Sequence, residues 1–254
     1  MTALLRALSA EALKLRGTLA LWMCLVAPAA VVALITLKIA SFEPGNRPMP
    51  APEDAWFTFA QQTLVFWAFL MLPLFVTLQS ALLAGLEHGN RQWKHLLALP
   101  LPRGAHYLAK QFALTATVTL AMASLLVLIP LGGWLLALLQ PGSGIAGAPP
   151  WAFLATRIGA CLVAALLIIA LHHWISIRWR SFTVAVSVGM IASVGSILIG
   201  QSERFGHLYP WSIPAQVLAG RGGERIEMAM LIGLIGGLVV TGLGLWSFVR
   251  RDDI

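Results

Sequence analysis

Residues 111–140 read QFALTATVTLAMASLLVLIPLGGWLLALLQ and contain no Asp, Glu, Lys or Arg. A helix of that length extends about 45 Å at 1.5 Å per residue, and the hydrocarbon core of a bilayer is only about 30 Å thick. An isolated helix satisfies its own backbone hydrogen bonds, so it is the form in which such a run crosses lipid. This stretch therefore predicts a membrane-spanning helix.

The rest of the chain repeats this pattern. Charge-free runs cover residues 19–37, 55–86, 111–156, 158–177, 181–202 and 228–249. Each run is close to, or above, the length that a membrane-spanning helix needs. We therefore predict an all-α integral membrane protein, a single transmembrane domain over 1–254, with six transmembrane helices near 19–40, 63–86, 108–140, 151–177, 182–202 and 227–249.

The composition excludes several other classes of protein. Hydrophobic residues make up 59% of the chain and charged residues 11%, against roughly 45–50% and about 25% in soluble domains. So few charges exclude a cytosolic enzyme and a disordered regulator. Cys24 and Cys161 both lie within apolar runs, so we expect buried thiols and no disulfide framework.

The net charge of +7 follows the membrane topology. One alternating set of connections holds eleven basic residues and the other holds six, Lys38, Arg47, Arg157, Arg204, Arg221 and Arg225. The positive-inside rule then places both termini in the cytoplasm. The basic residues lie between apolar runs, so they indicate contact with anionic lipid and no nucleic-acid partner. Residues 19–40 are too long for the apolar part of a signal peptide, so we expect a retained helix.

Residues 1–18 favour an interfacial helix before the first span. Leu4, Leu5, Leu8, Ala12 and Leu15 share one arc at 100° per residue, and the charged Glu11 and Lys14 point elsewhere. The alternative is a basic flank that only orients the first span.

The connection between the second and third spans holds more than a turn requires. Trp93, Leu96, Leu97 and Pro100 follow one another at spacings of one helical face, and Arg91 and Lys94 flank them. An aromatic anchor with a cationic rim is typical of a helix that a cytosolic partner binds. A helix that lies on lipid without a partner remains the alternative.

Small residues in the fifth and sixth spans indicate close packing of helices. They form two pairs four positions apart, Gly189 with Ser193 and Gly233 with Gly237, which let helix backbones approach within one chain or between two chains.

The connection 203–225 between these spans contains Tyr209, Pro210, Trp211 and Pro214. This pattern predicts an external hairpin that dips into the outer leaflet or an aromatic anchor at its surface.

No catalytic or metal-binding pattern emerges from the sequence. His172 and His173 are adjacent on a helix, so they face about 100° apart and are not spaced to share one ion. Ser143 lacks the turn and the base that a serine hydrolase needs. Charge within the spans is limited to Lys38 and Arg157 near their outer ends, which argues against ion-coupled transport and leaves an apolar wall suited to an amphipathic substrate.

Three segments resemble the ABC type-2 permease family: Glu11-x-x-Lys14-x-Arg16, the stretch from Glu87 to Lys110, and the terminal Arg250-Arg251-Asp252. The similarity is greatest to the six-span permeases of bacitracin and lantibiotic (bacteriocin) immunity exporters. In that family a glutamate, a Trp-x-x-Leu-Leu-x-x-Pro core, a following basic residue and a Tyr-x-x-Lys motif recur. The matching positions here are Glu87, Trp93, Leu96, Leu97, Pro100, Arg103, Tyr107 and Lys110. Gln92 departs from the threonine that precedes the tryptophan in this pattern.

The resemblance implies a permease subunit of an ATP-driven exporter in a bacterial inner membrane, which confers immunity to a hydrophobic peptide or antibiotic. Segment 87–107 would be the coupling helix that contacts a separate ATPase, and Glu11, Lys14 and Arg16 would belong to the elbow helix. The hairpin would cap the exit of the transport route.

The chain has no Gly-x-x-x-x-Gly-Lys-Ser/Thr loop, so we expect it to bind no cofactor and to be no enzyme, with ATP and Mg²⁺ held by two ATPase subunits. A second permease chain, identical or homologous, would complete the transporter. Two alternatives remain, a membrane-anchored assembly subunit that moves no solute and a polytopic membrane enzyme.

Overall fold

The computed structural model describes residues 2–41, 49–89, 101–179, 181–202, 204–218 and 224–250, with Thr2, 86–89 and Glu224 described by their backbone alone. All regular structure in these ranges is helical. The described helices are α1 (Thr2–Leu15), α2 (Leu19–Ala40), α3 (Pro52–Phe66), the π-helix η1 (Trp67–Met71), α4 (Leu72–Gly89), α6 (Arg103–Leu139), the short 3₁₀-helix η2 (Pro141–Ser143), α7 (Trp151–Arg178), α8 (Phe182–Ile199), α9 (Ile213–Gln216) and α10 (Glu224–Val249).

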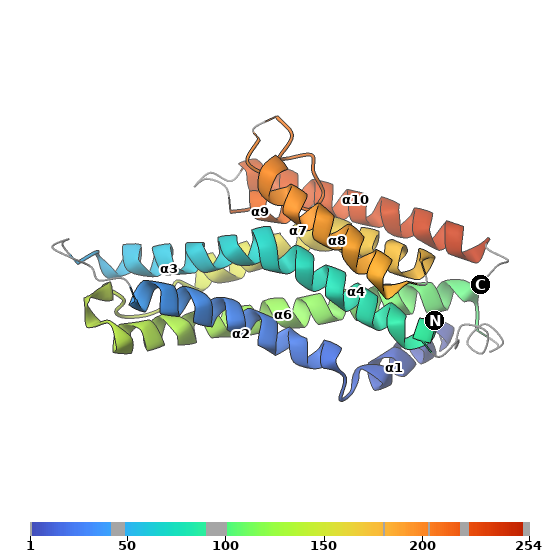
Figure 1. The fold of residues 1–254 in the computed structure, drawn as a ribbon, viewed down its shortest axis with the longest axis horizontal. Helices are drawn as coiled ribbons and strands as arrows, with labels where there is room; N and C mark the ends of the chain where they lie inside the picture. The colour runs from blue at the N-terminus through green and yellow to red at the C-terminus, as the bar shows by residue number, and fades with distance from the viewer. Residues whose placement is uncertain are drawn as a thin grey trace.

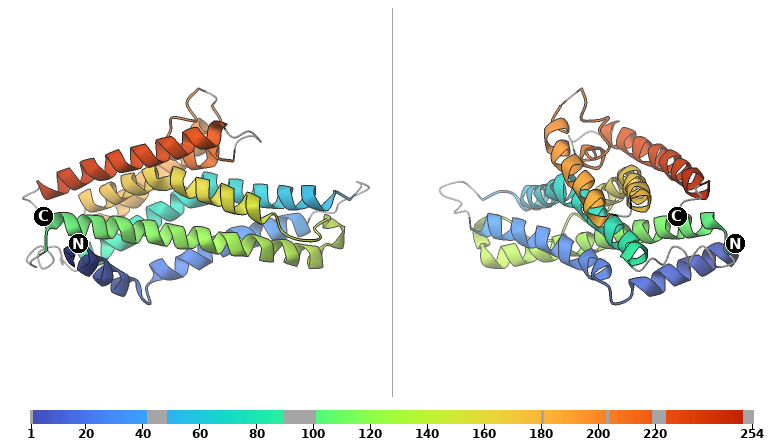
Figure 2. Two further views of the ribbon diagram at one scale, coloured as in Figure 1. Left: turned by 180° about the vertical axis from the view of Figure 1, so that it is seen from behind. Right: turned by 45° about the vertical axis from the view of Figure 1, so that its right-hand side comes forward.

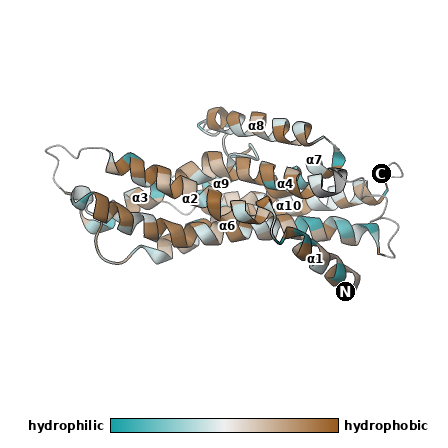
Figure 3. Ribbon diagram, turned by 60° about the horizontal axis from the view of Figure 1, so that its bottom comes forward, coloured by the Kyte–Doolittle hydropathy of each residue, from teal (hydrophilic) through white to brown (hydrophobic). Residues whose placement is uncertain are grey.

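Six stretches within the described ranges are long and apolar enough to cross a membrane, so the chain is a multi-pass membrane protein. They are Leu19–Ala40, Pro52–Gly85, Arg103–Leu139, Trp151–Arg178, Phe182–Ile199 and Arg225–Val249. They form an elongated bundle (Figure 1). Hydrophobic residues follow the long helices, and hydrophilic ones gather in α1 and towards the helix ends near the termini (Figure 3). The prediction of an all-α protein with six spans is confirmed.

The second span is much longer than predicted. We expected it to begin near residue 63, but the helix begins at Pro52. Pro52 suits the first turn of a helix, because the missing proline N–H has no partner there in any case. Trp56 and Phe59 are buried, and the Trp56 indole donates to the Ala146 carbonyl at 3.0 Å. These aromatic residues therefore pack inside the protein. The third span also begins earlier, at Arg103 instead of residue 108.

Pro73 explains an irregular turn within the second span. A proline lacks the N–H that would bond the carbonyl four residues earlier, here that of Phe69. The helix forms the π-turn η1 just before this point, and the Ser196 hydroxyl of α8 donates to the Phe69 carbonyl at 3.2 Å. The turn thus joins α8 to the second span by a side-chain hydrogen bond.

The core lies where α2, the α3–η1–α4 helix, α6 and α7 meet. Trp67, Met122 and Ile168 are fully buried there, and the Trp67 indole donates to the Met122 sulfur at 3.3 Å. The helices α8 and α10 lie outermost, with α10 packed along α7 (Figure 2). Large apolar side chains such as Ile191, Leu198 and Leu238 are exposed on these two helices, as expected of a surface that faces lipid.

Candidate functional site

Most of the predicted coupling segment lies outside the described residues. Residues 90–100 are not described, so Arg91, Trp93, Lys94, Leu96, Leu97 and Pro100 have no described position. Glu87 belongs to α4, but its side chain is also outside the described part. The segment leaves α4 at Gly89 and joins α6 at Arg103. These two points lie at one end of the bundle, together with α1 and the last turn of α10, which we call the terminal end (Figures 1 and 2).

A buried ion pair at the terminal end joins α1 to α6. The Lys110 ammonium lies 3.2 Å from Glu11 Oε2, and the Lys14 ammonium lies 2.7 Å from Glu11 Oε1. Lys110 is 3% exposed and Glu11 is 5% exposed. Lys110 also donates to the Leu83 carbonyl of α4 at 3.5 Å. The Glu11-x-x-Lys14 pattern and the Tyr107-x-x-Lys110 pattern are thus in direct contact, although 99 residues separate the two ions.

The helix α1 packs on the bundle through residues outside its apolar arc. The sequence predicts an interfacial helix in which Leu4, Leu5, Leu8, Ala12 and Leu15 share one arc and Glu11 points elsewhere. In the structure Ala7 and Glu11 are buried, whereas Leu5 and Ala12 are exposed. A carboxylate can occupy the packed face because two ammonium groups meet it there. Arg16 of the predicted elbow is exposed beyond the end of α1.

The electrostatics of Glu11 give a pH prediction. Burial alone raises the pKa of the Glu11 carboxyl, but the charges of Lys110 and Lys14 and their hydrogen bonds outweigh it and hold the pKa below its usual value. A lowered folded-state pKa stabilises the fold above the unfolded pKa of about 4.3, and this contribution is lost as the pH falls through the folded-state value. We expect the native chain to melt at a higher temperature than Glu11→Gln at pH 6, and the gap to close as the pH falls below about 4. A gap that persists unchanged at pH 3 would contradict the ion pair as its source.

The first two turns of α6 contact α7 and α10 as well as α1. The Tyr107 carbonyl lies 3.1 Å from His173 Nε2, and the Tyr107 ring packs on Phe248 of α10 at 5.6 Å between centroids. Gly104 lies against Leu245, where an added methyl group would come within 3.3 Å of that side chain. The start of α6 therefore contacts three other helices. We call the residues that make these contacts the terminal cluster: Glu11, Lys14, Tyr107, Lys110, His173 and Phe248.

The predicted hairpin packs back onto the bundle. The Trp211 indole donates to His172 Nε2 at 2.9 Å, and the Tyr209 hydroxyl donates to the Ala192 carbonyl at 2.9 Å. Pro214 is buried in α9, next to the half-buried Pro210 and Trp211. Arg157 donates to the Val217 carbonyl at 2.6 Å. Two side chains of α7 and a backbone carbonyl of α8 thus fix residues 209–218 in place.

Sequence reasoning did not find the roles of the two histidines. His172 accepts the Trp211 hydrogen bond, and its buried Nδ1 atom has no hydrogen-bond partner among the described residues. His173 faces a different helix, because adjacent residues on a helix point about 100° apart. Two neighbouring polar residues in an apolar span are a signal for two separate buried contacts, but the partners Trp211 and Tyr107 are distant in sequence.

The small-residue pairs pack within the chain. An added methyl group on Gly189 would overlap Thr77 of α4, and Ser193 donates to the Gly189 carbonyl at 2.7 Å. Gly233 and Gly237 lie against the backbone of α7, near Ala164 and Leu166. These contacts account for both pairs without a second chain.

A groove of about 630 Å³ opens between α2, the α3–η1 helix and α8. Its lining is mainly apolar, with Phe66, Phe69 and Ile197 among the residues. The polar residues Lys38, Gln61, Gln62 and Gln201 also line it, and Lys38 donates to Gln62 at 3.3 Å. The groove thus combines an apolar wall with one cation.

One comparison with known proteins identifies a family for this chain. The family described as "ABC-2 family transporter protein" matches residues 7–196, from α1 through most of α8. No curated protein and no solved structure matched the chain. The matched region includes most of α1, the coupling segment, the first four candidate spans and most of the fifth. The chain therefore belongs to the ABC-2 family of transporter membrane proteins and is an ABC permease.

Proposed function

We propose that this chain is the permease subunit of an ATP-driven exporter for hydrophobic or amphipathic molecules, such as an antimicrobial peptide, an antibiotic or a lipid-like compound. Two separate ATP-binding-cassette subunits would bind ATP and Mg²⁺, and a second permease chain, identical or homologous, would complete the assembly. Both termini would lie in the cytoplasm of a bacterium. The observation that carries this proposal is the terminal cluster, which joins the start of α6, where the segment expected to meet the ATPase ends, to α1, α7 and α10.

The coupling role follows from the length and contacts of α6. This helix runs without interruption from Arg103 to Leu139. A displacement of segment 87–107 by an ATPase would therefore act on one end of a rod about 55 Å long, at 1.5 Å per residue. Contacts with α1, α7 and α10 near that end would transmit the motion to other spans, as in packed helix interfaces with two discrete arrangements.

The groove between α2, the α3–η1 helix and α8 supports the proposed substrate class. Aromatic and aliphatic side chains bind apolar parts of a ligand, and a small number of polar groups fix its orientation. Phe66, Phe69 and Ile197 supply the first kind of surface here, and Lys38 with Gln62 supplies the second. An amphipathic molecule with an acceptor or an anionic group matches this combination.

The coupling proposal predicts a loss of ATPase activity in Trp93→Ala. Removing an aromatic anchor from an interface typically costs about 2 kcal/mol, or roughly 30-fold in affinity. We expect ATP hydrolysis by the purified assembly to fall when the ATPase subunit is present in limiting amounts. The amount of permease in the membrane is expected to stay normal. Glu87→Ala is expected to act in the same direction.

Trp151→Ala provides the matched control, because Trp151 is an exposed tryptophan at the start of α7, away from the terminal end. ATPase activity in that variant is expected to equal that of the native assembly. Native activity in both Trp93→Ala and Glu87→Ala would exclude segment 87–107 as the contact with the ATPase.

The whole proposal is tested by purification from native membranes, followed by transport in vesicles. We expect a tagged permease to co-purify with an ATPase that carries a phosphate-binding loop, and the complex to move an amphipathic dye or peptide in an ATP-dependent way. An intact complex that hydrolyses ATP but moves no amphipathic compound would favour the assembly-subunit alternative. A chain that binds no ATPase would contradict both.

A further inference from the structure

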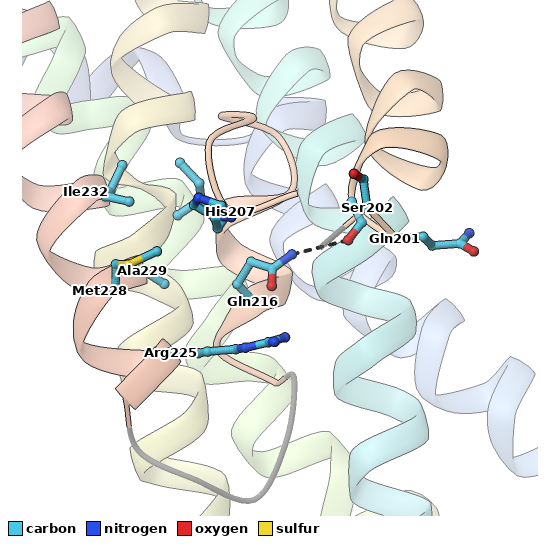
Figure 4. Close-up of a pocket in the computed structure, with 10 residues that line it drawn as sticks. Gln201, Ser202, His207, Gln216, Arg225, Met228, Ala229 and Ile232 are labelled. Carbon is cyan, nitrogen blue, oxygen red and sulfur yellow. Dashed lines mark hydrogen bonds between the residues drawn. The ribbon is translucent and has the colours of Figure 1, made fainter. Parts of the chain in front are cut away.

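A polar pocket of about 310 Å³ lies where α8, the hairpin and the start of α10 meet, at the ends of α8 and α10 away from the termini. Its polar lining side chains come from three segments, Gln201 and Ser202 after α8, His207 and Gln216 in the hairpin, and Arg225 in α10. In Figure 4 the Arg225 side chain extends from α10 towards Gln216, which donates to the Gly200 carbonyl at 3.3 Å. The pocket is thus formed by elements that the sequence separates.

The lining of this pocket favours an anion. Arg225 brings a guanidinium, and Ser202 and His207 bring groups that can donate hydrogen bonds. No acidic side chain is among the described residues that line it. A guanidinium binds phosphate through two parallel hydrogen bonds, and such charge-assisted bonds are stronger than neutral ones.

An apolar groove of about 540 Å³ adjoins the polar pocket, and Ser202 lines both. Leu198, Ile199, Phe205 and Leu208 form most of its surface. Leu198 is 74% exposed and Leu208 is 62% exposed, so this groove is open to the surroundings. A polar cationic pocket that continues into an open apolar groove is complementary to a molecule with an anionic head and an acyl chain.

The depth of the pocket also suits a lipid headgroup. Tyr209 and Trp211 lie in the hairpin beside it, and their rings pack 5.4 Å apart between centroids. Half-buried Tyr and Trp residues concentrate where membrane proteins meet the headgroup region. At 310 Å³ the pocket is near the small end of the range of about 300–1,000 Å³ for ligand sites, which is enough for a headgroup and too small for a whole lipid.

We propose that this pocket binds the phosphate of an anionic glycerophospholipid, with an acyl chain along the groove of Leu198, Ile199, Phe205 and Leu208. The lipid would connect α8, the hairpin and α10 at the membrane surface. Among the described lining residues, this site shares only Gln201 with the groove assigned to substrate under the proposed function. Its occupation requires neither an ATPase nor transport.

The test measures lipid binding to the purified full chain in detergent by native mass spectrometry. We expect one tightly held molecule of palmitoyl-oleoyl phosphatidylglycerol per chain, retained in preference to phosphatidylcholine with the same acyl chains. Phosphatidylcholine carries the same phosphate, but its quaternary ammonium would be repelled by Arg225. Equal retention of the two lipids would overturn the proposal.

Arg225→Gln is expected to weaken binding of phosphatidylglycerol about tenfold, as for the loss of a hydrogen bond to a charged group. Arg178→Gln is the matched control, because it removes the same charge from an exposed arginine at the carboxyl end of α7. Binding of phosphatidylglycerol is expected to be unchanged in this variant. Equal losses in the two variants would mean that total charge alone attracts the lipid, which would overturn the site.

Two further measurements separate a lipid from a small anion. Glycerol 1-phosphate, which carries a phosphate and a glycerol but no acyl chains, is expected to bind far more weakly than phosphatidylglycerol. Leu208→Ser is expected to weaken binding of phosphatidylglycerol and to leave binding of glycerol 1-phosphate unchanged. Equally tight binding of glycerol 1-phosphate would overturn the lipid assignment.

Glu203 and Glu224 adjoin lining residues in sequence, and the double variant with glutamine at both positions is expected to retain the lipid. Loss of the lipid there would contradict an anion site.

Discussion

Replacing Glu11 by alanine is expected to lower the free energy of unfolding by about 3–5 kcal/mol, the range for removing one partner of a buried ion pair. The reason is the position of Lys110, which is 3% exposed and lies 3.2 Å from the Glu11 carboxylate. Without that carboxylate, the ammonium group keeps its desolvation cost and loses its counter-ion. Unfolding of the purified chain by sodium dodecyl sulfate, followed by circular dichroism, measures the change.

Two variants identify the source of that loss. Glu53→Ala removes an exposed glutamate in the first turn of α3, and a change within about 0.5 kcal/mol is expected there. Glu11→Ala combined with Lys110→Met replaces the pair by apolar groups, and most of the lost stability is expected to return, because the buried ammonium that lost this carboxylate is removed with it. A double variant less stable than Glu11→Ala would contradict this account.

Replacing Gly233 by alanine is expected to cost about 2–3 kcal/mol, at the upper end of the range for overpacking. The added methyl group would overlap the Ala164 backbone and lie 2.6 Å from the Val163 carbonyl oxygen in α7. Backbone atoms of a packed helix cannot rotate away as a flexible side chain can, so α10 would have to move off α7. The same unfolding measurement reports the change.

Gly242→Ala is the matched control on the same helix. A methyl group at Gly242 meets no atom within 4 Å, so the change should be neutral or should stabilise the helix by up to about 1 kcal/mol through higher helix propensity. The comparison thus separates close backbone packing from the general effect of glycine in a helix. Equal stability of the two variants would exclude the close α7–α10 contact.

Much of the fold could be predicted from apolar runs alone, because a run without charge has to leave water and a helix is the form in which it does so. The family membership likewise agrees with the resemblance carried by the motifs. The start of the second span was missed because the charge-free run 55–86 is longer than a membrane-spanning helix needs, so the run alone does not fix where the helix begins. Glu53 and Asp54 lie in the first turn of α3, where carboxylates interact favourably with the helix dipole, so the helix also includes these two charges.

The sequence by itself determined the membrane class, the six helices and the segments that pack closely, since each of these depends on the composition of a local stretch. Only the tertiary structure decided that Glu11 faces Lys110, that His172 receives the Trp211 indole and that Arg225 shares a pocket with His207. Polar side chains of this kind find partners from distant helices, and the spacing of residues along one helix carries no information about which helix will lie opposite.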